Sequence, residues 1–125
     1  MVQGRDVERV LGPLEAEVME RFWATPGAGF NVREMLEVLN ADRDSALAYT
    51  TVMTVMARLA DKEILHRERE GRGYRYFAAL PDVAAIAVRD VVRDFGEAAV
   101  AQFVDEARAD PQLLRRLEKL LKEQR

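Results

Sequence analysis

Residues 47–77 read LAYTTVMTVMARLADKEILHREREGRGYRYF and predict a helix followed by a β-hairpin. On a helical wheel, five apolar residues share one side at the i, i+3, i+4, i+7 spacing of a buried stripe. They are Val52, Val55, Met56, Leu59 and Ala60. The opposite side carries Thr50, Thr51, Thr54 and Arg58, joined by the methyl group of Ala57. This side lacks the Glu/Lys mixture of a typical solvated helix face.

The threonine-rich side favours an interaction with DNA. Threonine is a mediocre helix former, so helix propensity does not explain its repetition. Hydroxyl groups that reach phosphates or base edges, methyl groups that contact thymine methyls and a forked guanidinium would explain it. The candidate DNA contacts of this helix are Tyr49, Thr50, Thr51, Thr54 and Arg58. The alternative is a surface helix whose threonines are incidental.

The hairpin extends this interpretation. Two strand-like runs, 64–70 and 74–77, flank the turn residues Gly71-Arg72-Gly73. A helix with a Thr/Arg face followed by an arginine-rich hairpin is the order of elements in a winged helix, where the hairpin, or wing, rests on the DNA. We expect Arg69, Arg72 and Arg75 to be the wing cations. The alternative is that they are solvated hairpin charges.

Two further helices are predicted before the threonine-rich one. Pro13 opens the first, because proline suits the first helical position. Asn31 and Glu34 form a capping-box pattern that opens the second, over residues 31–40. Phe30 is expected to form a short strand paired with the wing. Residues 1–9 are polar, and we expect them to be frayed at the start.

Residues 81–125 predict three short amphipathic helices with apolar stripes that they cannot bury well on their own. A second copy of the same segment is the natural partner, which gives an isologous dimer. The alternative is that these helices fold back on the winged domain. The candidate dimerisation residues are Val91, Phe95, Val100, Phe103, Val104, Leu114, Leu117 and Leu121. The expected fold is therefore mainly α with a small β wing: a winged helix-turn-helix DNA-binding domain over 1–80 and a helical dimerisation domain over 81–125.

Composition narrows the function classes. The chain has no cysteine and one histidine, His66, so no metal site, cofactor or catalytic arrangement is predicted. With 33% charged residues, no apolar run of membrane-spanning length and no signal peptide, we expect a cytoplasmic protein without membrane insertion. The net charge of −3 is awkward for a DNA-binding protein. Residues 45–80, however, hold six Lys or Arg against four Asp or Glu, so the charge is segregated.

Several segments carry a resemblance to a known family. They are LGPLEAEVM (11–19), Val32-Arg33-Glu34, AYTTVMTVM (48–56) with Arg58-Leu59, and Arg67-Glu68 to Tyr76. Together they resemble, in the same order over nearly the whole chain, the penicillinase repressors of the BlaI/MecI type. The resemblance implies a dimeric winged-helix repressor that binds TACA/TGTA-type inverted repeats in promoters of β-lactamase or penicillin-binding-protein genes. It also implies that the DNA-reading residues match Thr50, Thr51, Thr54 and Arg58, with the wing near Arg72.

The resemblance further implies a route of inactivation. Relatives are cleaved in the dimerisation arm, before a phenylalanine that aligns with Phe103, when a membrane sensor-protease pathway is triggered by a β-lactam. Gln102 precedes Phe103 here, where staphylococcal members carry asparagine, so Gln102–Phe103 is the candidate cleavage site. The cysteine-rich tail of copper-responsive relatives has no counterpart in this sequence.

We therefore interpret the sequence as that of a homodimeric repressor that covers a palindromic operator in double-stranded DNA and contributes to antibiotic resistance. Cleavage or loosening of the arm would release monomers, which lose the avidity of two tethered half-site contacts. One alternative is a winged-helix module that binds protein and not DNA, which the acidic net charge favours. The other is a repressor relieved by a small ligand, for which no convergent polar set marks a pocket.

Overall fold

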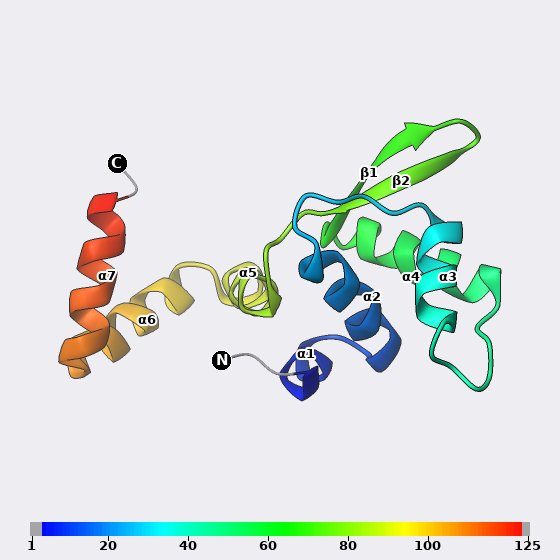
Figure 1. Ribbon diagram of the computed structural model, residues 1–125. Helices are drawn as coiled ribbons and strands as arrows, with labels where there is room; N and C mark the ends of the chain where they lie inside the picture. The colour runs from blue at the N-terminus through cyan, green and yellow to red at the C-terminus, as the bar shows by residue number, and fades with distance from the viewer. Residues whose placement is uncertain (1–3, 124–125) are drawn as a thin grey trace. The chain divides into compact units, whose positions relative to one another are not determined.

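The computed structural model describes residues 4–123, and its chain divides into two compact units between Ile86 and Ala87. The first unit contains α1 (Gly4–Val10), α2 (Pro13–Ala24), α3 (Val32–Asn40), α4 (Tyr49–Asp61), β1 (Leu65–Glu70) and β2 (Gly73–Ala78) (Figure 1). Helix α5 (Val83–Phe95) crosses the division, and α6 (Glu97–Ala109) and α7 (Pro111–Glu123) follow. The division lies inside α5, beyond residue 80, and the assignment of DNA binding and dimerisation to separate domains remains a prediction.

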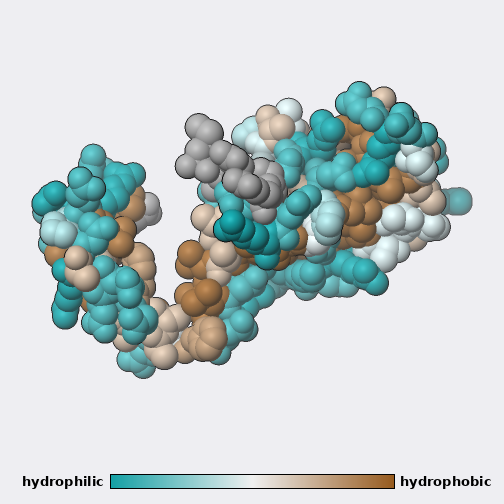
Figure 2. All heavy atoms as spheres, turned by 90° about the horizontal axis from the view of Figure 1, so that it is seen from below, coloured by the Kyte–Doolittle hydropathy of each residue, from teal (hydrophilic) through white to brown (hydrophobic). Residues whose placement is uncertain are grey.

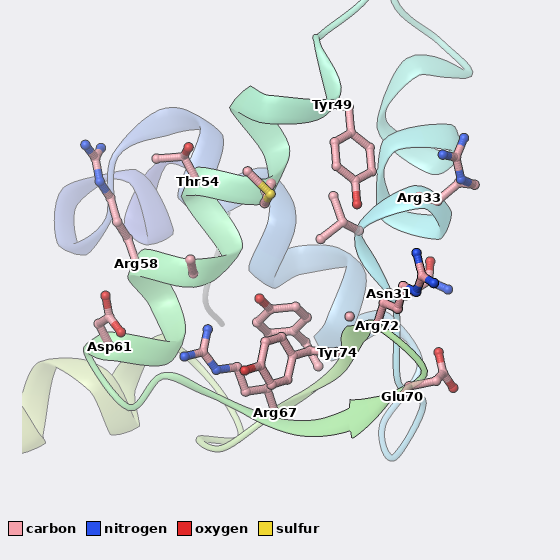
Figure 3. Close-up of a pocket in the computed structure, with 15 residues that line it drawn as sticks. Asn31, Arg33, Tyr49, Thr54, Arg58, Asp61, Arg67, Glu70, Arg72 and Tyr74 are labelled. Carbon is pink, nitrogen blue, oxygen red and sulfur yellow. The ribbon is translucent and has the colours of Figure 1, made fainter.

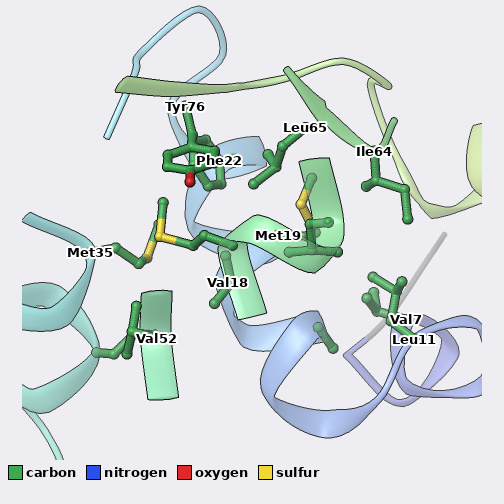
Figure 4. Packing of buried hydrophobic residues seen from close by; sticks show 14 of the residues in the cluster. Val7, Leu11, Val18, Met19, Phe22, Met35, Val52, Ile64, Leu65 and Tyr76 are labelled. Atoms are coloured by element: carbon green, nitrogen blue, oxygen red, sulfur yellow. The ribbon is translucent and has the colours of Figure 1, made fainter. Parts of the chain in front are cut away.

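The core of the first unit is built from one face of each helix and from the inner face of the hairpin (Figure 4). Val52, Met56 and Leu59 of α4 are completely buried, which confirms the centre of the predicted stripe, while Val55 and Ala60 are half-buried. The other large buried side chains include Val18, Met19, Phe22, Met35, Leu65 and Tyr76. Removal of this apolar surface from water is the main stabilising contribution, and it fixes which side of α4 remains outside.

Side chains set the ends of α3 and α4. Asn31 Oδ1 accepts a hydrogen bond from the Glu34 amide at 2.8 Å, and Glu34 Oε1 accepts one from the Asn31 amide at 2.9 Å, so the predicted capping box is confirmed. The side chain of Asn40 then bridges the connection to α4: its Oδ1 accepts from the Leu47 amide at 2.8 Å and its Nδ2 donates to the Leu47 carbonyl at 3.2 Å. This bridge holds the chain just ahead of Tyr49, where α4 begins.

The two strands form an antiparallel hairpin in which Leu65 pairs with Ala78 and Glu70 with Gly73. Gly71 has φ 59°, the positive value required at the first central position of a type II′ turn. Phe30 forms an isolated bridge with Tyr76, as predicted, through backbone hydrogen bonds of 3.0 and 2.9 Å. At the far end of β2, the indole Nε1 of Trp23 donates a hydrogen bond to the carbonyl of Leu80 at 2.9 Å.

Fraying is expected at the start of residues 1–9, and no helix is predicted there, whereas residues 4–10 form α1. Val7 in α1 is 4% exposed and Leu11, just after the helix, is 5% exposed, so this segment contributes two buried side chains to the core. Its sequence offers few apolar positions, and the packing of those few decides its structure. Residues 1–3 lie outside the described part of the chain.

The second unit is entirely helical in its described residues, 87–123. Gly96, with φ 57°, separates α5 from α6. The carboxylate of Asp110 accepts hydrogen bonds from the amides of Gln112 and Leu113 and so caps α7. Among residues 87–123, only Ala107 is buried. The predicted fold class is confirmed: a mainly helical chain with a two-stranded wing after its helices, as in winged helix-turn-helix proteins.

Candidate nucleic-acid interface

The outer face of α4 is exposed as a unit. Thr50, Thr51, Thr54 and Arg58 are all solvent-exposed, because the core takes the opposite side of the helix. None of these side chains is needed to fill the interior. The structure therefore presents the threonines and the arginine to whatever binds this face.

A groove of about 750 Å³ runs beside this face, between the start of α3, helix α4 and the wing (Figure 3). Four arginines from three different elements line it: Arg33, Arg58, Arg67 and Arg72. The acidic residues among its lining are Asp61 and Glu70. The groove is thus net positive in a chain whose overall charge is −3, and this segregation favours an anionic partner.

Two arginines of the wing lie over the ring of Tyr74. The guanidinium carbon of Arg67 lies 4.4 Å from the ring centroid of Tyr74, and that of Arg69 lies 5.6 Å from it. A hydrogen bond with the Tyr76 side chain raises the pKa of Arg67. Stacking on Tyr74 restricts both guanidinium groups on one face of the wing.

Arg33 and Arg67 belong to this surface although the sequence analysis did not select them. Arg33 lies on the first turn of α3, with its guanidinium carbon 5.7 Å from the ring centroid of Tyr49, which is 42% exposed. The signal for Arg67 was available in the sequence, since strand residues two apart share a face and Arg67 is two residues from the predicted wing cation Arg69. Arg33 has no such local signal, because α3 and α4 meet only in the folded unit.

Arg75 has different neighbours from the other wing arginines. Its Nη1 donates to Glu34 Oε1 and to the Gly29 carbonyl, both at 2.9 Å, and its Nε donates to Glu70 Oε1 at 2.8 Å. These bonds raise the pKa of Arg75, Glu70 first and Glu34 next, and lower the pKa of Glu70. The predicted wing cation is therefore engaged within the protein, where it ties the wing to α3 and to the loop before Phe30.

The predicted dimerisation residues are largely at the surface of the second unit. The exposed ones are Val91 (47%), Phe95 (66%), Val100 (52%), Phe103 (46%) and Leu121 (62%). Val104, Leu114 and Leu117 are half-buried. Brown and tan atoms lie at the surface over α5 and α6 in Figure 2. An apolar hollow of about 420 Å³ between α5 and α6 is lined by Val91, Phe95, Ala98, Ala99, Gln102, Phe103 and Glu106.

The candidate cleavage site lies inside a helix. Gln102 and Phe103 are both in α6 and both exposed, and Gln102 Nε2 donates to Glu106 Oε1 at 3.4 Å. The peptide bond between Gln102 and Phe103 is thus accessible at the surface but held in helical geometry.

Within residues 4–123, no group of three or more His, Cys, Asp or Glu side chains is placed to hold a metal ion. His66 stacks on Phe77 with ring centroids 5.2 Å apart and is exposed on the wing. No helix among the described residues combines the length and apolarity needed to cross a bilayer.

Comparison with known proteins identifies a family whose model covers residues of both units. A family model described as penicillinase repressor matches residues 11–123. A transcriptional regulator, BlaI, from two strains of Mycobacterium tuberculosis is 47% identical over 66 residues, which are 53% of this chain and 46% of the relative. An uncharacterized 16.5 kDa protein of Latilactobacillus sakei is 33% identical over 72 residues, or 58% of this chain and 47% of the relative. The matched part of the chain thus spans about half the length of these relatives.

Proposed function

Because this chain belongs to the penicillinase repressor family, we propose that it is a dimeric transcriptional repressor that binds a palindromic operator in the cytoplasm. One observation carries the proposal: the exposed Thr/Arg face of α4 lies beside an arginine-lined groove that also includes the wing. Hydroxyl and guanidinium groups are the donors that bind phosphates and read base edges, and here they converge from a helix and a hairpin.

In this proposal α4 enters the major groove of DNA. Thr50, Thr51 and Thr54 contact base edges, while Arg58 binds a phosphate or a guanine. Arg72, at the tip of the hairpin, and Arg69 contact the sugar-phosphate backbone beside the major groove. The negative net charge of the chain limits non-specific attraction to DNA, so sequence-dependent contacts have to supply much of the affinity.

The second unit supplies the second half-site contact by pairing with its counterpart in another copy. Its described residues leave Phe95, Val100 and Phe103 largely in water, at 66%, 52% and 46% exposure. Phe95 and Phe103 also line one apolar hollow, and large apolar side chains exposed together in this way are typical of an interface. A two-fold dimer can place two recognition helices about 34–36 Å apart, one turn of DNA, which suits an inverted repeat. Occupation of a promoter by the dimer would exclude RNA polymerase.

Salt titration of DNA binding tests the proposal. A fluorescein-labelled duplex with TACA and TGTA half-sites is titrated with the protein at increasing KCl concentration. Phosphate contacts predict that log K falls linearly with log salt, by about 0.9 per phosphate neutralised. A duplex with scrambled half-sites is the control. If the protein binds neither duplex at low salt, the protein-binding alternative replaces the repressor.

Threonine variants test the recognition face. Thr51→Ala and Thr54→Ala each remove an exposed hydroxyl and methyl group, and we expect each to cost about 1 kcal/mol or more of discrimination between the palindrome and the scrambled duplex. Thr25→Ala, at the end of α2 and away from the groove, is the matched control. Unchanged discrimination in both α4 variants, with an unchanged melting temperature, would remove α4 from the DNA contact.

Release from the operator is proposed to follow cleavage between Gln102 and Phe103 by a protease of a membrane sensor pathway. Proteases bind substrates in extended form, so α6 has to open before the bond can be cut. Within a single chain only Ala107 is buried among the described side chains of α6, so opening of this helix is opposed mainly by its proposed dimer contacts. Extract from β-lactam-treated cells of the source organism should cut the wild type near this bond and spare Phe103→Ala. An intact wild-type band would exclude this route of induction.

A further inference from the structure

The threonine-rich face of α4 is bordered on the groove side by an apolar strip, of which only Tyr49 is among the candidate DNA contacts. Tyr49, Met53 and Ala57 follow one another at intervals of four residues and line the groove. Tyr49 is 42% exposed and Met53 is 41% exposed. Val52 and Met56, which lie next to Met53 on the helix but belong to the buried stripe, are completely inaccessible. We call these three residues the apolar strip.

The surroundings of the apolar strip indicate what can cover it. Arg33 stands beside Tyr49, and Arg58, Arg67 and Arg72 line the same groove. A purely apolar peptide would supply no anionic partner for these guanidinium groups. A partner that presents apolar groups inside an anionic frame matches both features. The major groove of DNA is such a surface, because phosphates border it and the C5-methyl group of thymine is its main apolar element.

We propose that the apolar strip of α4 recognises thymine through its C5-methyl group, with Met53 as the principal contact. This inference rests on the proposed function and adds to it a specificity-determining residue outside the Thr/Arg face. Met53 suits the role because its unbranched thioether adapts to an uneven surface, and Tyr49 and Ala57 extend the contact along the helix. Thymines next to the helix would then be preferred over cytosines, which lack the methyl group.

Replacement of thymine by deoxyuridine isolates this contact, since it removes the methyl group and preserves Watson–Crick pairing. Each thymine of a TACA/TGTA half-site is replaced in turn, and binding is measured by fluorescence anisotropy. For the thymine that contacts Met53 we expect about fourfold weaker binding, the loss that corresponds to one buried methyl group. The same replacement in both half-sites should weaken binding about fifteenfold, because the two contacts are independent.

Three variants assign the effect to the strip. Met53→Gln keeps length and helix propensity but removes the apolar end, so it should bind the thymine and deoxyuridine duplexes equally at that position. Met53→Leu should retain the preference. Thr51→Ser removes a methyl group from a proposed base contact that the helical repeat places on the far flank of α4. It can change the overall affinity, but the ratio of thymine to deoxyuridine binding at the Met53 position should stay that of the wild type. Melting temperatures confirm that the variants fold.

The possible failures can be told apart. If the wild type binds the thymine duplex but is indifferent to deoxyuridine at every position, the inference is refuted and the proposed function stands. If the penalty persists in Met53→Gln and disappears in Thr51→Ser, a threonine methyl group is the contact and Met53 is not. If the wild type binds no thymine duplex at all, the proposed function fails and the inference fails with it.

Discussion

Arg72 and Arg75 are three residues apart on the wing, and their replacement should affect DNA binding in different ways. Arg72 lies at the exposed turn and lines the groove, so Arg72→Gln should remove one phosphate contact from each protomer. Loss of two contacts per dimer makes the slope of log K against log salt shallower by about 1.8. Between about 50 and about 200 mM salt, this difference in slope changes the ratio of wild-type to Arg72→Gln affinity about tenfold.

Arg75→Gln should leave that slope unchanged, because the guanidinium of Arg75 is already bonded to Glu34, Glu70 and the Gly29 carbonyl. Instead, Arg75→Gln should weaken the attachment of the wing to α3 and to the loop before Phe30. The amides of Phe30 and Tyr76 donate to each other's carbonyls across the isolated bridge. In the absence of DNA, these amides should exchange with deuterium faster in Arg75→Gln than in the wild type.

The measurements are anisotropy titrations over a KCl series and hydrogen exchange followed by NMR or mass spectrometry. Arg72→Gln is the matched control in the exchange experiment, where it should behave as the wild type. An equal loss of slope in both variants would show that Arg75 neutralises a phosphate. The interpretation of its carboxylate contacts as a structural clamp would then be refuted.

Three further predictions concern stability and assembly. Gly29→Ala should destabilise the fold by about 1–3 kcal/mol in urea unfolding, because the new Cβ would lie 2.6 Å from the ring of Phe77. Gly73→Ala is the control and should be nearly neutral, because its Cβ would have no neighbour within 4 Å. Leu121→Glu should raise the dimer dissociation constant in sedimentation; persistence of the dimer at low concentration would remove α7 from the interface. Hydrogen bonds from the Asn31 amide first and from Arg75 next hold the pKa of Glu34 below its usual 4.5. The ionised carboxylate therefore stabilises the folded state fully above pH 4.5, and this stabilisation is lost as the pH falls through the lowered pKa. Glu34→Gln should flatten this acid dependence in thermal melts, and an unchanged pH profile would contradict the assignment.

Local patterns made much of the first unit predictable. The stripe through Val52, Met56 and Leu59 repeats with the period of a helix, and burial of one side leaves the threonines outside whatever the partner elements are. The capping pair Asn31 and Glu34 acts within a few residues, so its sequence spacing already contains its geometry.

Contacts between distant segments were less accessible to the sequence analysis. Arg75 was grouped with Arg69 as a wing cation, yet strand alternation places the two on opposite faces of the hairpin. Its partner Glu34 is 41 residues away in the sequence, and no local pattern connects the two. The apolar strip could have been found from the four-residue spacing of Tyr49 and Met53, but their exposure depends on how closely α3 and the wing approach α4.

Trp23 is the protein's only tryptophan, and its indole nitrogen is bonded to the carbonyl that ends the wing segment, at Leu80. Indole emission is sensitive to polarity and hydrogen bonding, so the chain contains an optical reporter where β2 gives way to the segment that leads into α5. Detachment of that segment would shift the emission spectrum of an unlabelled sample. Stopped-flow mixing with operator DNA could therefore time any such rearrangement without an engineered dye.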